Sequence, residues 1–128
     1  MTATLNTTAQ NPGHVTSVHR YYELVDAGDV TGLVNMFSPD ATYRRPGYAP
    51  MVGHEEMSAF YGGARVIREG RHTVDKVVES AEEVAVYGTF NGVLHDGRQV
   101  DLRFSDFFEF TEDGHFARRD TFFFAPLV

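Results

Sequence analysis

Apolar and aromatic positions dominate the second half of the chain, where they occur in runs separated by turn residues. Four runs are rich in Phe, Val and Tyr, as β-strands are: residues 71–79, 84–94, 100–110 and 116–124. Glu112-Asp113-Gly114 and His95-Asp96-Gly97-Arg98 are Gly-containing stretches typical of hairpin loops. The pattern therefore predicts four antiparallel strands.

The first half of the chain has helical spacing instead. Apolar residues recur at intervals of three and four over residues 15–27, and Gly28 ends that run. Asp29 suits the cap of a short second helix, which ends before a short strand at Thr42–Arg45. Residues 54–61 form a third predicted helix. Helices followed by antiparallel strands predict an α+β fold, in which three helices pack on a curved sheet and leave a pocket.

Composition narrows the class of protein. We expect one domain over residues 14–128 of the 128-residue chain, preceded by a disordered tail at residues 1–13 that is rich in Thr and Asn. The net charge of -7, with no dense Lys/Arg cluster, argues against nucleic-acid or membrane partners. With no cysteine and no ligand spacing among six histidines, neither a metal nor a cofactor is expected. No apolar run reaches the ~20 residues of a membrane span, so we expect a cytoplasmic protein.

The register of the last hairpin decides which polar side chains share a face. A three-residue loop at residues 112–114 places Asp106 opposite Asp120, on the same face as several phenylalanines. A two-residue turn at Asp113-Gly114 would instead place Thr121 opposite Asp106 and turn Asp120 outward. We favour the first register because it matches Phe with Phe three times, and a one-residue slip reverses the face of every side chain.

The preceding hairpin adds polar side chains to that face of the sheet and leaves the opposite face of its first strand apolar. A two-residue turn at Asp96-Gly97 sets Tyr87 opposite Asp106 and turns Asn91 to the same side. The other side of this strand is then apolar, and a second subunit would cover it. We therefore expect a homodimer through an outer sheet face formed by Val84, Val86, Phe90, Leu94 and Phe123.

Two carboxyl groups on an aromatic face predict acid–base chemistry. Burial and mutual repulsion disfavour ionisation of both, so one of Asp106 and Asp120 is expected to stay protonated and donate, while the other acts as a base. The alternative is that an arginine neutralises them, and four are candidates: Arg45, Arg103, Arg118 and Arg119. Arg45 is otherwise a surface charge or an anchor for a substrate carboxylate. His72 is the one histidine on a strand able to reach the pocket.

The predicted pocket lies between the first and third helices and the concave sheet face. Only one of the neighbours Tyr21 and Tyr22 can point into it. We expect the catalytic residues to be Asp106, Asp120 and Tyr21. The expected substrate-binding residues are Tyr22, Tyr43, Arg45, Tyr61, Tyr87, Asn91, Phe104 and Phe122.

Several stretches resemble a known family: Tyr21 with Ala27-Gly28-Asp29, Met36 to Thr42, Gly53 to Glu56, and Asp106 to Phe110. Over residues 15–124 the chain is similar to SnoaL-like, ketosteroid-isomerase-like members of the NTF2-like superfamily. The resemblance implies a cone-shaped fold with a mixed-edge sheet. It also implies that Tyr21 is the oxyanion-hole tyrosine and Asp106 the protonated aspartic acid of the isomerases.

The resemblance also shows departures. Arg45 stands where the isomerases have their base aspartate, so their proton-shuttling route is not expected here. Asp120 resembles the late-strand aspartate of limonene-epoxide-hydrolase-like members. Thr89 and Asn91 stand near the positions of the Arg and Asp that those enzymes add, so epoxide hydrolysis by that triad is not expected either.

These observations give three hypotheses for function. The first is an acid–base enzyme without a cofactor, namely a cyclase, isomerase or dehydratase acting on a small, largely apolar carbonyl or polyketide-like compound. Asp106 and Tyr21 would donate hydrogen bonds and Asp120 would accept the proton. The alternative is a non-catalytic protein that binds a small molecule, with Arg45 anchoring an acidic ligand. The third is an interaction protein that uses its outer sheet face.

Overall fold

The computed structural model describes residues 12–124, and the elements follow the predicted order. They are α1 (Pro12–Ala27), α2 (Val30–Val34), β1 (Phe37–Arg44), β2 (Met51–Val52), α3 (Gly53–Ala59), a π-helical turn η1 (Phe60–Ala64), β3 (Ile67–Glu79), β4 (Glu83–Leu94), β5 (Gln99–Phe110) and β6 (Phe116–Phe123). Of the predicted tail, residues 1–11 lie outside the described residues and the rest begins α1. Within the described part of the chain, no helix is long and apolar enough to cross a membrane.

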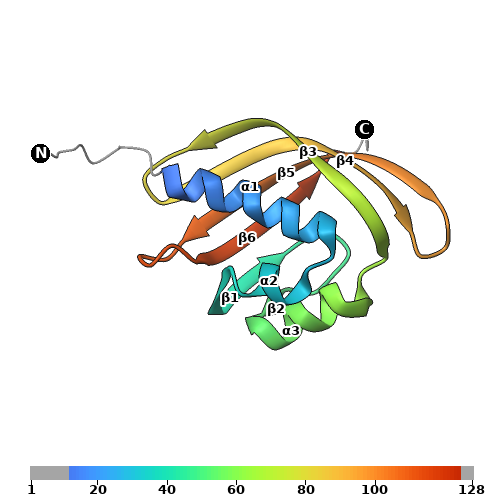
Figure 1. Cartoon of the computed structure of the whole chain (residues 1–128), viewed down its shortest axis with the longest axis horizontal. Coiled ribbons are helices and arrows are strands. Elements are labelled where there is room, and N and C mark those ends of the chain that lie inside the picture. The colour runs from blue at the N-terminus through green and yellow to red at the C-terminus, as the bar shows by residue number, and fades with distance from the viewer. Residues whose placement is uncertain (1–11, 125–128) are drawn as a thin grey trace, which may run out of the picture.

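A single curved, open sheet carries the helices on one face (Figure 1). The strand order is β2-β1-β6-β5-β4-β3, in which β1 runs parallel to β6 and all other neighbours are antiparallel. The long helix α1 crosses the sheet, while α2 and α3 lie beside its β1 end. The predicted α+β cone with a mixed-edge sheet is confirmed.

Local signals predicted the end of α1 and the start of α2 correctly, but the prediction that the second helix continues to Ser38-Pro39-Asp40 is wrong, because α2 ends at Val34 and β1 begins at Phe37. Gly28 adopts a left-handed φ of 75° after α1, and the Asp29 carboxylate accepts a hydrogen bond from the Gly32 backbone N–H at 2.9 Å, as a cap does. β1 begins at Phe37, within a stretch that resembled the end of a helix. At its start, Phe37 pairs with Phe116 of β6, almost 80 residues away, so a local pattern does not show this pairing.

The β5–β6 hairpin contains both predicted registers, one on each side of a bulge. Its three-residue loop is as expected, and Phe110 pairs with Phe116. Glu109 then pairs with Arg118, which leaves Ala117 as an extra residue. Beyond this bulge every side chain of β6 changes face. The prediction that Asp120 faces Asp106 is therefore wrong.

The consequence of the bulge is a different set of inward side chains on β6. Asp106 pairs with Thr121, and Phe104 pairs with Phe123 instead of Phe122. Arg119 and Thr121 are buried, whereas Phe122 is 54% exposed.

The β4–β5 hairpin also differs from the prediction by one residue. The Leu94 N–H donates to the Arg98 carbonyl at 2.8 Å, which closes a three-residue loop with Gly97 at a φ of 89°. Val86 therefore pairs with Asp106, and Tyr87 and Asn91 point outward. The apolar set predicted for the outer face lies in the core instead: Val84, Val86, Phe90 and Leu94 are buried.

The outer sheet face nevertheless exposes large aromatic side chains. Tyr87 is 44% exposed, Phe107 47%, Phe122 54% and Phe124 70%. The rings of Phe107 and Phe122 meet edge to face at 5.8 Å, so these side chains form a cluster on neighbouring strands. Contiguous exposed apolar patches are uncommon on monomers and often mark interaction sites.

A homodimer through the outer face remains a prediction, with this aromatic cluster in place of the original residues. Light scattering should show a dimer at micromolar concentration for the parent and a monomer for Phe107→Lys/Phe122→Lys, because two charges would then be desolvated at the interface. Val52→Lys, at a similarly exposed residue on β2, should remain dimeric. A monomeric parent would contradict the prediction.

Candidate functional site

A buried network of polar side chains fills the interior between α1, η1 and the sheet. Its centre is Asp106 on β5, whose side chain is 0% exposed. Asp106 accepts hydrogen bonds from the Arg119 guanidinium at 2.8 Å, from the Tyr22 hydroxyl at 2.5 Å and from the Thr121 hydroxyl. It was expected to stay protonated and donate; instead it accepts from an arginine and two hydroxyls, because the bulge brings Arg119 and Thr121 inside.

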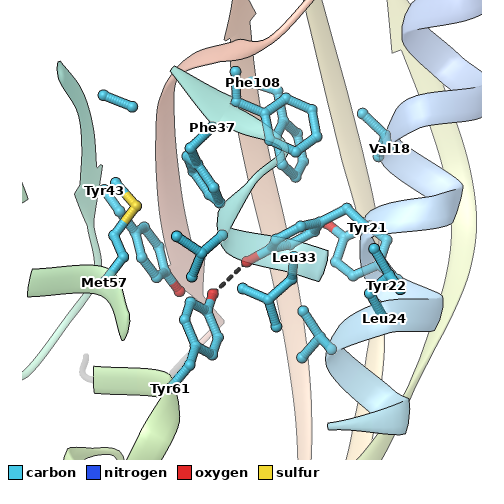
Figure 2. Close-up of a cluster of buried hydrophobic side chains, with 14 of the residues drawn as sticks. Val18, Tyr21, Tyr22, Leu24, Leu33, Phe37, Tyr43, Met57, Tyr61 and Phe108 are labelled. Carbon is cyan, nitrogen blue, oxygen red and sulfur yellow. Dashed lines mark hydrogen bonds between the residues drawn. The ribbon is translucent and has the colours of Figure 1, made fainter. Parts of the chain in front are cut away.

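Arg119 connects this carboxylate to two further tyrosines. Its Nη1 atom donates to the Tyr21 hydroxyl at 2.6 Å and to the Tyr61 hydroxyl at 3.0 Å. Those two hydroxyls also hydrogen-bond to each other where α1 approaches η1 (Figure 2). The guanidinium carbon lies 4.5 Å from the centre of the Tyr43 ring, within the range of a cation–π contact. The Nε atom of Arg119 is buried without a hydrogen-bond partner.

Burial sets the protonation state of the tyrosine hydroxyls. It is the main cause that raises the pKa of Tyr21, Tyr22 and Tyr61 above the ordinary value. The Arg119 charge opposes this effect at Tyr21, whereas the Asp106 charge adds to it at Tyr22. All three hydroxyls therefore keep their protons at neutral pH, and act as hydrogen-bond donors and acceptors, not as bases.

A small cavity lies on the other side of Arg119. Its volume is about 20 Å³, room for about one water molecule. Its polar lining consists of Arg45, His72, Arg119 and Thr121. Its apolar lining consists of Ile67, Phe90, Leu102, Phe104 and Phe123. Of the predicted substrate-binding residues, only Arg45 and Phe104 line this cavity.

His72 reaches the cavity from β3 and is held by a carboxylate at the end of α1. Its Nδ1 atom lies 2.7 Å from Asp26 Oδ1, and its backbone N–H donates to Asp26 Oδ2 at 2.9 Å. The two side chains are 11% and 23% exposed. Because the carboxylate oxygen accepts, Nδ1 is the donor of this hydrogen bond, and in the neutral imidazole Nε2 is then the nitrogen with the free lone pair. The arrangement resembles a base with its orienting group.

The Phe90 ring lines the same cavity, and two glycines leave the space that it occupies. Gly70 and Gly92 pair across β3 and β4. A Cβ atom at Gly70 would lie 2.2 Å from the Phe90 ring, and one at Gly92 would lie 2.6 Å from it. The Phe90 ring centre lies 4.8 Å from that of His72, so these glycines help to position the histidine.

Arg45 stands at the cavity without a carboxylate partner. Its Nη1 atom donates to the Tyr43 hydroxyl at 3.0 Å, and its guanidinium lies over the rings of Tyr48, Phe60 and Phe123 at 5.3–5.5 Å. Its Nε atom is buried without a hydrogen-bond partner. The counter-ion of Asp106 is therefore Arg119, and no ion pair to Arg45 forms within the described residues.

The remaining predicted residues lie outside the cavity. Asp120 is on the outer face, where Arg44 donates to it at 2.8 and 2.9 Å and Arg118 at 3.2 Å. The hydrogen bond from Arg44 is the main cause that lowers the pKa of Asp120, so it is a poor proton acceptor. Tyr21, Tyr22, Tyr43 and Tyr61 lie within the buried network behind Arg119. Tyr87, Asn91 and Phe122 point outward.

Sequence reasoning missed most of what lines the cavity. His72 had been recognised as the one histidine able to reach it, and Arg119 was one of four candidate partners for the acids. Thr121 is predicted to face Asp106 only in the register with a two-residue turn at Asp113-Gly114, which we did not favour. Asp26 had no detectable signal, because its partner is 46 residues away. Among residues 12–124, no three His, Asp or Glu side chains gather closely enough to hold a metal ion.

Replacing Asp106 tests the central ion pair. We expect Asp106→Asn to lower the free energy of unfolding at pH 7 by about 3–5 kcal/mol, because Arg119 would remain charged and buried without its partner. Chemical denaturation measures this change. Asp101→Asn, at an exposed carboxylate that also accepts a side-chain hydrogen bond, should change stability by about 0.5 kcal/mol or less. Equal stability of Asp106→Asn and the parent would show that the pair is not a structural centre.

Alkaline titration tests the buried hydroxyls. Tyrosines of the unfolded chain ionise near pH 10, while Tyr21, Tyr22 and Tyr61 hold their protons in the folded chain. Above about pH 10 the folded state therefore binds more protons, and stability should fall as pH rises.

Tyrosinate absorbance of the folded protein at about pH 11 should report fewer ionised groups than the unfolded protein. Tyr22→Phe should leave the number of groups ionised at about pH 11 in the folded protein unchanged, because the pKa of Tyr22 is raised by burial. Early ionisation of all six tyrosines of the native protein would contradict the network.

Comparison with known proteins supports the architecture. Residues 18–119 match the model of the SnoaL-like domain. An NTF2-like protein of unknown function from Burkholderia pseudomallei K96243 is 24% identical, with a TM-score of 0.81 over 89% of this chain and 92% of that one. TerC, co-crystallised with polyporic acid, is 20% identical, with a TM-score of 0.77 over 88% and 92%.

SalBIII is a third similar structure, described as an epoxide hydrolase/cyclase-like enzyme with a role in pyran ring formation in the polyether salinomycin. It is 19% identical, with a TM-score of 0.76 over 87% of this chain and 90% of that one. At these identities the three structures establish the fold alone. The domain match, which spans most of the chain, shows that this protein belongs to the SnoaL-like family and has its NTF2-like fold.

Proposed function

We propose that this protein is an enzyme that moves a proton on a small, largely apolar carbonyl compound, as a cyclase, isomerase or dehydratase. One observation supports this most directly: His72, held by Asp26, lines a cavity together with Arg119, whose buried Nε atom has no hydrogen-bond partner. A base with a fixed tautomer and a buried cationic donor are the two groups that proton abstraction next to a carbonyl requires.

The chemistry begins at His72. Its Nε2 atom takes a proton from a carbon next to the carbonyl, and the electron pair of that C–H bond moves to give an enolate. Arg119 donates a hydrogen bond to the enolate oxygen from Nε, and its charge stabilises the negative charge formed there. Asp26 pairs with the protonated imidazole.

The same proton then completes the reaction. In an isomerisation His72 returns it to a different carbon, and in a dehydration it protonates the hydroxyl group that leaves as water. In a ring closure the enolate carbon attacks a second carbonyl, whose oxygen takes the proton. No cofactor enters any of these steps.

The predicted catalytic residues have other roles in this proposal. Asp106, Tyr21 and Tyr61 accept hydrogen bonds from the Arg119 guanidinium on the side away from the cavity and so hold it in place. They are positioning residues, because none of them lines the cavity. Asp120, on the outer face, takes no part. The proton acceptor assigned to Asp120 by sequence is His72 in this scheme.

The cavity must enlarge when a substrate binds, because about 20 Å³ holds only about one water molecule. Arg45, which lines the same cavity and whose buried Nε atom has no hydrogen-bond partner, favours a second candidate, a protein that binds a small acidic ligand without turning it over. Activity that depends on His72 distinguishes the two candidates.

Exchange of the α-protons of 2-tetralone with D2O, followed by NMR, tests the proposal. The parent should accelerate exchange over buffer, and His72→Gln should lower the rate by about 10²–10⁴-fold, because the base is lost. Asp26→Asn should lower it less and shift the pH profile. His115→Gln removes a surface histidine that also pairs with an aspartate, and should leave the rate unchanged. Parent-like exchange by folded His72→Gln would refute the assignment.

A further inference from the structure

We propose that the cavity and a hollow beside η1 form one binding channel for an amphipathic organic anion, whose charged head is held by Arg45. Ile67 is the gate between the two spaces. This deepens the function proposed above by naming the substrate class, and rests on it only in treating the cavity as the substrate site. The ligand class is a small carboxylate with an apolar body.

Arg45 carries a positive charge that no carboxylate balances. Arg119 is neutralised by Asp106 at 2.8 Å, but Arg45 has no carboxylate within 4.0 Å among the described residues. Its contacts are one tyrosine hydroxyl and three aromatic rings, and its buried Nε donor is unpartnered. Aromatic faces tolerate a cation but do not neutralise it. A buried carboxylate would supply both the charge and the missing acceptor.

The hollow next to the cavity is also lined by cationic side chains. It has a volume of about 230 Å³, between the end of α1, α2 and η1. Arg65, Arg68 and His95 line it together with apolar side chains that include Val30 and Leu33. Arg68 has an exposed ion pair with Glu69, 3.5 Å away, which does not line the hollow.

No Asp or Glu lines either space. The chain has 18 acidic residues and only 11 Lys and Arg, so a lining with arginines and no acids runs against its composition. Of these arginines, Arg45 and Arg65 have no carboxylate within 4.0 Å among the described residues, and their charges attract anions and disfavour cations. The apolar lining of both spaces suits an uncharged hydrocarbon body. The hollow is below the ~300 Å³ of typical ligand sites, so the body is small.

Ile67 separates the two spaces. It is 8% exposed and lines both the cavity and the hollow. It opens β3 beside a bulge, because Ile67 pairs with Leu94 while Glu69 pairs with Val93. The preceding turn contains Gly62 and Gly63, where an added Cβ atom would meet nothing within 4 Å. A rotation of the Ile67 side chain into this space would join the cavity to the hollow.

Calorimetric titration with 2-naphthoate and its neutral isostere 2-naphthamide tests the charge requirement. The parent should bind the carboxylate at least about tenfold more tightly than the amide, an effect of the order measured for charged hydrogen-bonded pairs. Arg45→Met should lose at least that factor for the carboxylate only, and Arg45→Lys should recover part of it. Arg103→Met is the matched control, because Arg103 also lies over an aromatic ring, at 5.0 Å from Phe124, but on the outer face.

Two results would overturn the proposal. One is equal affinity for the acid and the amide in the parent, a comparison that needs no variant to fold. The other is a loss of affinity in Arg103→Met and not in Arg45→Met, which would place the site on the outer face.

The gate is tested by kinetics. Ile67→Ala should raise the association rate of 2-naphthoate several-fold in stopped-flow measurements, and Ile67→Phe should lower it. Identical rates in both variants and the parent would exclude Ile67 as the gate. Equal binding of acid and amide by a parent that still exchanges the 2-tetralone protons would contradict the anion site alone. Selective binding of the carboxylate without any exchange would contradict the acid–base chemistry alone.

Discussion

The buried pair of Asp106 and Arg119 is the interaction on which the rest of the interior depends. Removing two charges from water is costly, and the cost is offset only when their remaining donors and acceptors are satisfied. Here two hydroxyls complete the shell of Asp106, while Tyr21 and Tyr61 accept from Arg119. Because these tyrosines come from α1 and η1, the pair joins both to the sheet. Helix packing and the shape of the cavity are thus set by one polar network.

The local sequence pattern was sufficient to predict the fold class, but not which side chains of each strand point into the interior. The end of α1, the cap of α2, the four later strand runs and the Gly114 loop depend on neighbouring residues, and the sequence predicts them. The end of α2, the start of β1 and the short strand β2 are not predicted, because these depend on pairing within the sheet. The faces depend on two single-residue details, the extra Ala117 in β6 and the three-residue loop that ends at Gly97. Since side chains alternate with a period of two, each detail reverses a whole strand. The expected Phe–Phe pairs did not decide the register, because the competing register places Arg119 inside, where it forms a buried ion pair with Asp106.

The candidate site was harder to predict because its parts are distant in sequence. His72 and Asp26 meet across 46 residues, and Arg45 reaches the cavity from the end of β1. Family resemblance pointed to Tyr21 and Asp106, which do lie in the interior. It did not reveal Arg119 beside them, and this arginine changes what they do: a carboxylate with a guanidinium partner holds that partner in place. A role inferred from position in a fold therefore depends on the charge of its neighbours.

The bulge at Ala117 also decides between two very different interiors that one sequence could form. In the observed register the strand places a cation, Arg119, inside; the unbulged register would place an acid inside. If Ala117 entered the ladder, Asp120 would face Asp106 and the arginine would point outward, so that a buried ion pair would be replaced by two facing carboxylates. That register would keep the composition and the hydrophobic pattern of the chain yet lose its core. Deletion of Ala117 would instead retain the observed pairs, because Glu109 would still lie opposite Arg118.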